Sequence, residues 1–173
     1  MIRVLEKSLV DKISAGEVVE RPASVVKELI ENAIDAGADH LVVEVKDAGK
    51  SMIKVIDNGR GMNRDDLIMS YKSHATSKIS SADELFSVKS LGFRGEALSS
   101  IAAVSNLTIT SRQEGSDLGH EIQVEGGELV KDHESGSTAG TTVLVTDLFY
   151  NTPARRKHLK TNTTELNHII DIV

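Results

Sequence analysis

The sequence predicts a single α+β domain, and three observations carry this prediction. Residues 22–36 have the apolar spacing of a helix. Residues 41–46 and 51–56 alternate like two strands around a short turn, and further short strands with glycine-bearing turns follow residue 106. A chain of 173 residues with 39% hydrophobic and 27% charged residues has the length and composition of one globular domain.

The composition argues against several classes of protein. Aromatic residues make up only 3% of the chain, which is few for a single-strand binder that stacks successive bases. A formal net charge of −6 argues against a surface that coats DNA phosphates. The absence of cysteine excludes disulfides and thiolate metal sites, and no long apolar run marks a membrane span or an export leader. We therefore expect the cytoplasm, or the nucleus in a eukaryote.

The segment 22–36 is the clearest helix in the sequence. Pro22 suits the first turn of a helix and Gly37 suits its end. The apolar residues that recur at helical spacing are Val26, Leu29, Ile30, Ala33 and Ile34. The polar residues predicted on the opposite face are Glu28, Glu31, Asn32 and Asp35. The helix is thus predicted to bury one face and to gather three carboxylates and one amide on the other.

Residues 41–46 and 51–56 are predicted to form a β-hairpin, after which Asp57 lies at the end of a strand. Asn63 is predicted to cap a short helix that runs to about residue 73. Residues 74–95 are rich in Ser, Gly and Lys and are predicted to form a long loop. Loops of this length are typical of lids and binding segments.

The second half of the chain alternates short elements. It begins with a predicted helix of small residues, 96–104. The predicted strands with alternating residues are 107–110, 121–124 and 141–145. Thr163 or Thr164 is predicted to cap a last helix, whose apolar residues keep helical spacing up to Val173 without a stop signal. We therefore expect the polypeptide to continue beyond this residue.

The polar face of the 22–36 helix has two interpretations. It can be a solvated acidic surface, because like charges at helical spacing cost only about 0.2–0.5 kcal/mol per pair. It can also be a site for a hard cation, since oxygen ligands hold Mg²⁺ that carries phosphate and a neighbouring carboxylate polarises water. In the second interpretation Asn32 is the neutral ligand and Glu28 is the base.

The turn 57–61 is a candidate ligand contact. Asp57 offers an acceptor carboxylate, and Gly59 and Gly61 let the backbone approach a ligand closely. A tight turn without a ligand has the same composition, so this alternative stays open.

Residues 91–96 lead directly into the 96–104 helix. Free amide groups at the start of that helix, with Arg94 and Lys78, could receive an anion. Glycines that only bend the chain are the alternative.

Three longer strings of residues resemble the MutL family of DNA mismatch repair proteins. This family belongs to the GHKL superfamily of ATPases, together with gyrase, certain chaperones and histidine kinases. The strings are Ile13 to Leu29, Gly92 to Leu98 and Leu148 to Lys157. The match spans nearly the whole chain, and the departures at Ser14 and His158, where family members often carry Ala and Phe, fall on no proposed ligand.

The resemblance implies a fold and a set of site residues. Residues 1–173 would form a GHKL-type ATP-binding domain, a two-layer α/β sandwich with a mixed, mainly antiparallel sheet. With ATP and Mg²⁺ as cofactors, Glu28 would activate the attacking water and Asn32 would coordinate Mg²⁺. Asp57 would hydrogen-bond the adenine amino group, and Thr142 would lie near adenine. The other implied nucleotide contacts are Gly59 and Gly61 of the turn and the lid residues Thr76, Ser77, Lys78, Gly92, Phe93, Arg94, Gly95 and Glu96.

The resemblance also implies a slow ATP-driven switch, in which ATP orders a lid and brings two subunits together. The implied partners are a MutS-like mismatch-recognition protein, a downstream endonuclease, a helicase, and DNA bound weakly and without sequence preference. A homodimer is expected of the full-length protein and a monomer of this chain. The family's second N-terminal domain, which supplies a lysine to the γ-phosphate, would follow Val173, so hydrolysis is expected to depend on it.

Two alternatives belong to other classes. One is a different GHKL member, such as a topoisomerase subunit, a chaperone or a histidine kinase, although the match begins near residue 13 and leaves no room for an upstream phosphoacceptor helix. The other is a non-enzymatic DNA-binding or interaction module. The basic residues Arg155, Arg156, Lys157 and Lys160 either touch DNA phosphates or form a solvated helix end.

Overall fold

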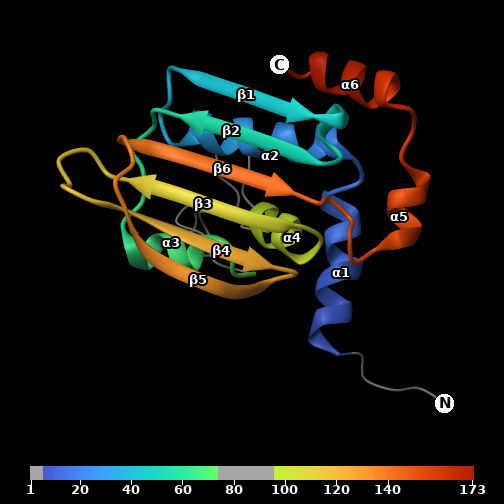
Figure 1. Ribbon diagram of the computed structural model, residues 1–173, viewed down its shortest axis with the longest axis horizontal. Helices are drawn as coiled ribbons and strands as arrows, with labels where there is room; N and C mark the ends of the chain where they lie inside the picture. The colour runs from blue at the N-terminus through green and yellow to red at the C-terminus, as the bar shows by residue number, and fades with distance from the viewer. Residues whose placement is uncertain (1–5, 74–95) are drawn as a thin grey trace, which may run out of the picture.

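The computed structural model describes residues 6–73 and 96–173, and within them six strands form one sheet in the order β1-β2-β6-β3-β4-β5 (Figure 1). The strands are β1 Leu41–Lys46, β2 Met52–Asp57, β3 Asn106–Arg112, β4 Gly119–Glu125, β5 Glu128–Ser135 and β6 Gly140–Thr146. The helices are α1 Lys7–Val18, α2 Pro22–Asp35, α3 Arg64–Ser70, α4 Ala97–Ala103, α5 Pro153–His158 and α6 Asn162–Ile170, with the 3-10 turn η1 Asp47–Gly49.

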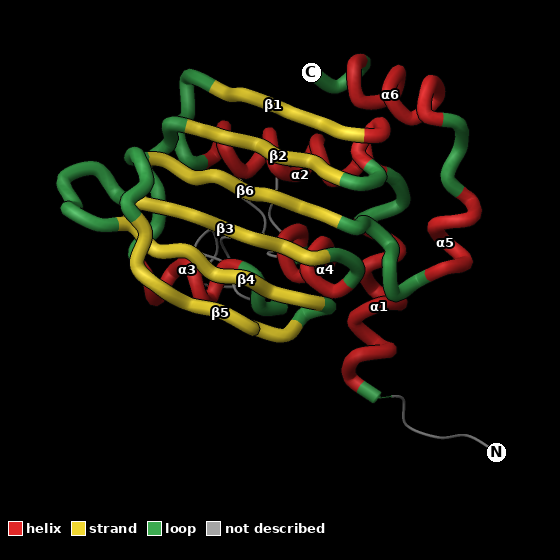
Figure 2. The backbone as a smooth tube through the Cα atoms, viewed as in Figure 1, coloured by secondary structure: helices red, strands yellow, loops and turns green. Residues whose placement is uncertain are grey.

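The sheet and the helices form two layers. Figure 1 shows α2, α3 and α4 behind the sheet, and Figure 2 shows the same separation of helices from strands. Every one of the five strand pairings among the described residues is antiparallel. The predicted two-layer α+β sandwich with a mainly antiparallel sheet is therefore confirmed. No helix in the described ranges is both long enough and apolar enough to cross a bilayer.

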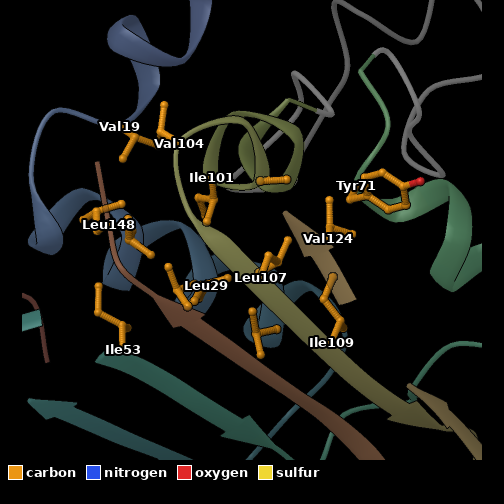
Figure 3. Close-up of a cluster of buried hydrophobic side chains, with 14 of the residues drawn as sticks. Val19, Leu29, Ile53, Tyr71, Ile101, Val104, Leu107, Ile109, Val124 and Leu148 are labelled. Atoms are coloured by element: carbon orange, nitrogen blue, oxygen red, sulfur yellow. The ribbon is translucent and has the colours of Figure 1, made fainter. Parts of the chain in front are cut away.

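The core lies between the layers and follows the period of two along the strands. Ile53 and Val55 of β2 are buried opposite Val145 and Val143 of β6. On the next strands the buried residues continue as Leu107, Ile109, Ile122 and Val124. Figure 3 shows Leu107 of β3 between Leu29 of α2 and Ile101 of α4 in this interface. Each such side chain contributes about 1.5–3 kcal/mol when it leaves water, so this interface holds the two layers together.

Helix α2 agrees closely with the predicted helix 22–36. Pro22 occupies its first turn, and Val25, Val26, Leu29 and Ala33 are buried against the sheet. The prediction was wrong for Ile34, which is 48% exposed because it lies beyond the edge of the buried face. The buried face is thus narrower than the apolar spacing suggested.

Most other predicted elements are present with shifted ends. The 41–46 and 51–56 hairpin is β1 and β2, the helix at 96–104 is α4, and Asn63 caps α3 by accepting the Asp66 N–H at 2.9 Å. Helix α3 ends at Ser70, and α6 begins after its cap Thr161 and ends at Ile170. Helices α1 and α5 and strand β5 were not predicted. The predicted loop 74–95 lies outside the described residues.

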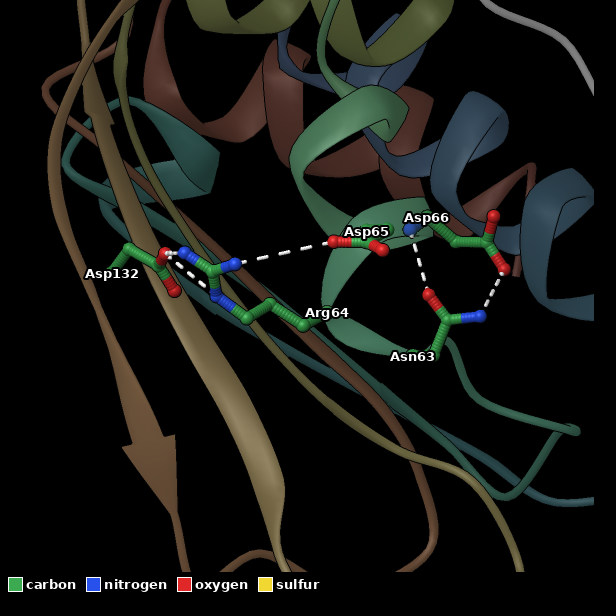
Figure 4. A network of polar contacts seen from close by, with 5 residues as sticks. All are labelled: Asn63, Arg64, Asp65, Asp66 and Asp132. Atoms are coloured by element: carbon green, nitrogen blue, oxygen red, sulfur yellow. Dashed lines mark hydrogen bonds and ion pairs between the residues drawn. The ribbon is translucent and has the colours of Figure 1, made fainter.

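An ion pair ties the edge strand β5 to the start of α3 (Figure 4). Arg64 donates from Nε and Nη2 to Asp132 Oδ2 at 3.0 and 2.5 Å. Because the Arg64 side chain is exposed, solvent screens the pair, and the contact sets position more than it adds stability. It holds the start of α3, which follows the glycine turn after β2, against the edge strand β5.

Candidate functional site

Asp57 is the last residue of β2, and the sheet pairing points its side chain toward the helix layer. Val55, two residues earlier, is buried on that face, and side chains two apart in a strand share a face. Oδ1 of Asp57 accepts hydrogen bonds from Gly59 N at 2.8 Å and from Thr141 N at 3.2 Å. Oδ2 has no donor among the described residues. The carboxylate is therefore held by one oxygen, and the other can accept a hydrogen bond from a ligand.

The electrostatics of Asp57 fit a half-buried acceptor. Burial raises the pKa of its carboxyl above the ordinary value, and the N–H groups of Gly59 and Thr141 act in the opposite direction by stabilising the charge. A partly desolvated carboxylate bonds a donor more strongly than one in water. The site is therefore chemically suited to an amino group.

The turn after Asp57 is anchored to the C-terminal end of α2. Arg60 N donates to Ala36 O at 3.0 Å. Asn58 Oδ1 accepts from Asp39 N at 3.1 Å and from His40 N at 3.0 Å. A Cβ on Gly59 would lie 2.9 Å from the Cβ of Ala36. Close packing thus explains why this position is a glycine. The same contacts bring Asp57 to the C-terminal end of α2.

Gly61 has φ of +66°, and a Cβ at this position would overlap the backbone carbonyl of Arg112. We expect Gly61→Ala to lower the free energy of unfolding by about 3 kcal/mol, from backbone strain and the clash together. Gly115, with φ of +82° and nothing within 4 Å, is the matched control, and Gly115→Ala should cost only about 1 kcal/mol. Urea denaturation measures both. Equal losses would show that the Arg112 contact does not constrain the turn.

The predicted contact of Thr142 with adenine stays a prediction, but the pairing of β6 places its neighbour Thr141 beside Asp57. Thr142 lies opposite Ile56, so its side chain points away from the helix layer and from the Asp57 carboxylate. Thr141 lies opposite Asp57 and shares the inward face with Val143. The alternation of Thr141, Val143 and Val145 was the signal that could have identified it. Thr141 is therefore the residue of this segment that lies on the same face as the Asp57 carboxylate.

Glu28 and Asn32 lie one turn apart on α2 and are both partly buried. At 100° per residue both lie beside the buried positions Val25 and Leu29, at one edge of the buried face and not opposite it. Glu31 makes an i,i+4 ion pair with Lys27 at 3.8 Å. None of the four polar residues predicted on this face is fully exposed, so a purely solvated acidic surface describes it poorly.

The helix orders these groups along its axis. The rise of 1.5 Å per residue puts Asn32 about 6 Å and Glu28 about 12 Å from Ala36, where the Asp57 turn is attached. The Asp57 carboxylate, the Asn32 amide and the Glu28 carboxylate therefore follow one another along the direction of α2. An oxygen-rich ligand with an amino group at one end suits this order. The described residues contain no cluster of three or more His, Cys, Asp or Glu that could hold a metal by itself.

Most of the predicted lid is not described. Thr76, Ser77, Lys78 and residues 92–95 lie outside the described ranges. Glu96 is the N-cap of α4, and its carbonyl accepts from Ser100 N at 2.9 Å and from Ser99 Oγ at 3.0 Å. The anion contact predicted at this helix start stays a prediction.

The basic residues between positions 155 and 160 lie in two different environments. A Cβ on Gly16 of α1 would overlap the guanidinium of Arg155, so this arginine packs against α1. Arg156, Lys157 and Lys160 are exposed. Only these three remain available as a surface patch, which weakens the predicted DNA contact.

The comparisons with known proteins identify the class of this chain. Residues 20–142 match the model of the histidine kinase-, DNA gyrase B- and HSP90-like ATPases. The chain therefore belongs to this class of ATPases, whose match covers α2, the Asp57 turn and the start of β6.

Within that class the chain belongs to the MutL family of DNA mismatch repair proteins. It is 56% identical to MutL of Prosthecochloris aestuarii over 99% of this chain and 28% of that protein. It is 53% identical to MutL of a Thermoanaerobacter species over 99% of this chain and 28% of that protein. The chain thus spans about a quarter of the length of these relatives.

Two solved structures share the fold. The Aquifex aeolicus MutL ATPase domain complexed with ADP superimposes with a TM-score of 0.68 at 36% identity, covering 90% of this chain and 54% of that one. The N-terminal domain of a DNA repair protein gives a TM-score of 0.78 at 29% identity, covering 94% and 46%.

Proposed function

We propose that this chain binds Mg²⁺-ATP along α2 and serves as the nucleotide-driven part of a MutL-like mismatch repair protein. The observation that carries the proposal is the Asp57 carboxylate, which is held at Oδ1 by Gly59 and Thr141 and has no donor to Oδ2 within residues 6–73 and 96–173. Asp57 accepts a hydrogen bond from the adenine amino group, and Thr141 completes the base end of the site. The triphosphate extends along α2 toward Asn32 and Glu28.

The residues of α2 supply the chemistry at the phosphate end. Asn32 offers a neutral amide oxygen, a ligand type that Mg²⁺ accepts beside phosphate oxygens and water. The metal, when bound, neutralises charge on the phosphates. Glu28, a partly buried carboxylate one turn away, orients and polarises the attacking water as the base. Gly59 and Gly61 shape the turn, and residues 76–78 and 92–96 are the further contacts proposed for the phosphates.

At the level of the whole protein, ATP acts as a switch between two subunits. ATP binding favours the homodimer, which passes a signal from a MutS-like mismatch-recognition protein to an endonuclease and a helicase. This chain by itself is a monomer that forms one ATP-binding domain over residues 1–173. DNA is bound weakly through the exposed residues of α5 and the following loop. The protein works in the cytoplasm, or in the nucleus of a eukaryote.

Calorimetric titration with ATP, with and without Mg²⁺, tests the proposal. We expect saturable binding that strengthens when Mg²⁺ is present, because Asn32 contacts the nucleotide through the metal. DNA titrated under the same conditions should bind only at low salt. No heat of binding at millimolar ATP, together with tight DNA binding, would favour a DNA-binding module and end the proposal.

A further inference from the structure

Ser111 joins three segments of the site through one hydroxyl group. It lies near the end of β3 and has no exposed surface. Its Oγ accepts from Met62 N at 2.8 Å, contacts Gly140 O at 3.1 Å and contacts Thr141 Oγ1 at 2.9 Å. The glycine turn, β3 and β6 are thus held together directly beside Asp57.

The hydrogen-bonding capacity of the two hydroxyls determines their direction. A serine hydroxyl has one proton and accepts two hydrogen bonds. The carbonyl of Gly140 can only accept, so Ser111 donates its proton there. Met62 N–H fills one acceptor position of Ser111, and the hydroxyl of Thr141 donates into the other. All three contacts of Ser111 are then satisfied, as expected for a buried polar group.

Because the Thr141 hydroxyl donates to Ser111, it can only accept hydrogen bonds from the side of Asp57. Its proton is turned to Ser111, and its free lone pairs lie on the same face as Oδ2 of Asp57. The base end of the site therefore presents two acceptors and no hydroxyl donor from these residues. A ligand with an amino group matches them, whereas a carbonyl oxygen at the same place would face two acceptors.

We propose that Ser111 is a positioning residue that fixes the Thr141 hydroxyl as an acceptor, so that the site selects a purine with a 6-amino group over one with a 6-oxo group. The inference rests on the proposed ATP site and adds the element that sets its selectivity. Ser111 itself touches no nucleotide. It acts by orienting Thr141 and by holding the Met62 end of the turn.

The test compares ATP with inosine triphosphate, which differs from ATP at the 6-position and at the N1 proton. In Ser111→Ala the hydroxyl of Thr141 is free to rotate and to donate. We expect the ATP dissociation constant to rise about tenfold, the value of one neutral hydrogen bond, and the ATP-to-inosine-triphosphate preference to fall by a similar factor. Thr141→Val should give a similar loss of preference. Adding Ser111→Ala in that background should change the preference no further, because Ser111 acts on the preference only through the Thr141 hydroxyl.

Ser105→Ala is the matched control. Ser105 is also fully buried, and its Oγ donates to Ile101 O at 2.7 Å at the opposite end of β3. Its replacement should cost similar stability and leave the nucleotide preference unchanged. If the wild-type protein binds ATP and Ser111→Ala keeps the full preference, the inference is wrong and the proposed function stands. If the wild-type protein binds neither nucleotide, both are wrong.

Discussion

Replacing Asp57 with asparagine should weaken ATP binding at least about 100-fold while the protein remains folded. The amide oxygen of asparagine can still accept from Gly59 N and Thr141 N, so the internal contacts of the turn are kept. The amide nitrogen then takes the place of Oδ2 and presents a donor to the adenine amino group. Loss of a charge-assisted hydrogen bond together with two opposed donors accounts for the size of the effect. Calorimetric titration with ATP measures it.

Asp147→Asn is the control for this change. Asp147 follows β6 at the end of the sheet away from Asp57, so the same chemical replacement there should leave ATP affinity unchanged. Comparable losses of affinity in the two variants would place the nucleotide elsewhere.

The stability of Asp57→Asn should depend on pH in a defined direction. Because burial raises the folded-state pKa of Asp57 above 3.8, the protonated carboxyl is favoured by folding. The stability that this raised pKa contributes is fully present below pH 3.8 and is lost as the pH rises through the folded-state pKa. Relative to the wild type, the asparagine variant should therefore gain stability as the pH rises from below 3.8 to neutrality. Thermal unfolding at several pH values tests the sign.

The elements predicted from sequence were those with strong local signals. Helix α2 has Pro22 at its start and Gly37 at its end, and Asn63 caps α3 through its own side chain. Helix α1 lacks such signals, since Glu6 makes no capping bond and neither terminal turn carries the favourable charges. Strand β5 lies at the sheet edge, where most of its side chains are exposed and no alternation is needed. These two elements depend on contacts with distant segments.

The difference between local and long-range signals also decides which residues around Asp57 could be predicted from the sequence. Asp57 could be found because a carboxylate ends an apolar strand and precedes two glycines. Alternation marks Thr141 as facing the same side as Val143, but the contacts of Thr141 and Ser111 could not be assigned from the sequence, because they depend on which strands become neighbours. β6 comes last in the sheet sequence but lies between β2 and β3, and this insertion alone places them beside Asp57. Local patterns thus predicted the carboxylate at the end of β2, and the long-range pairing supplies the residues that hold it.

Glu28→Ala should retain ATP binding and lose turnover, with the rate falling about 100- to 10,000-fold as expected for removal of a general base. Asn32→Ala should lose the Mg²⁺-dependent part of ATP binding, because it removes the amide proposed to hold the metal. Turnover and ATP binding of the two variants are measured in the full-length protein, since this chain spans 28% of the MutL of Prosthecochloris aestuarii. Steady-state hydrolysis and equilibrium titration with ATP, in Mg²⁺ and in chelator, separate the two effects.

Glu31→Ala controls for the loss of a carboxylate from the same helix. Glu31 pairs with Lys27 at 3.8 Å, an i,i+4 contact that contributes about 0.3–0.5 kcal/mol to the helix. Its replacement should leave the rate and the Mg²⁺ dependence of binding unchanged, because Glu31 pairs with Lys27 and has no proposed contact with the nucleotide. Equal loss of ATP binding in Glu28→Ala and Asn32→Ala would contradict the separate roles, since a base acts on the water and a metal ligand acts on the bound nucleotide.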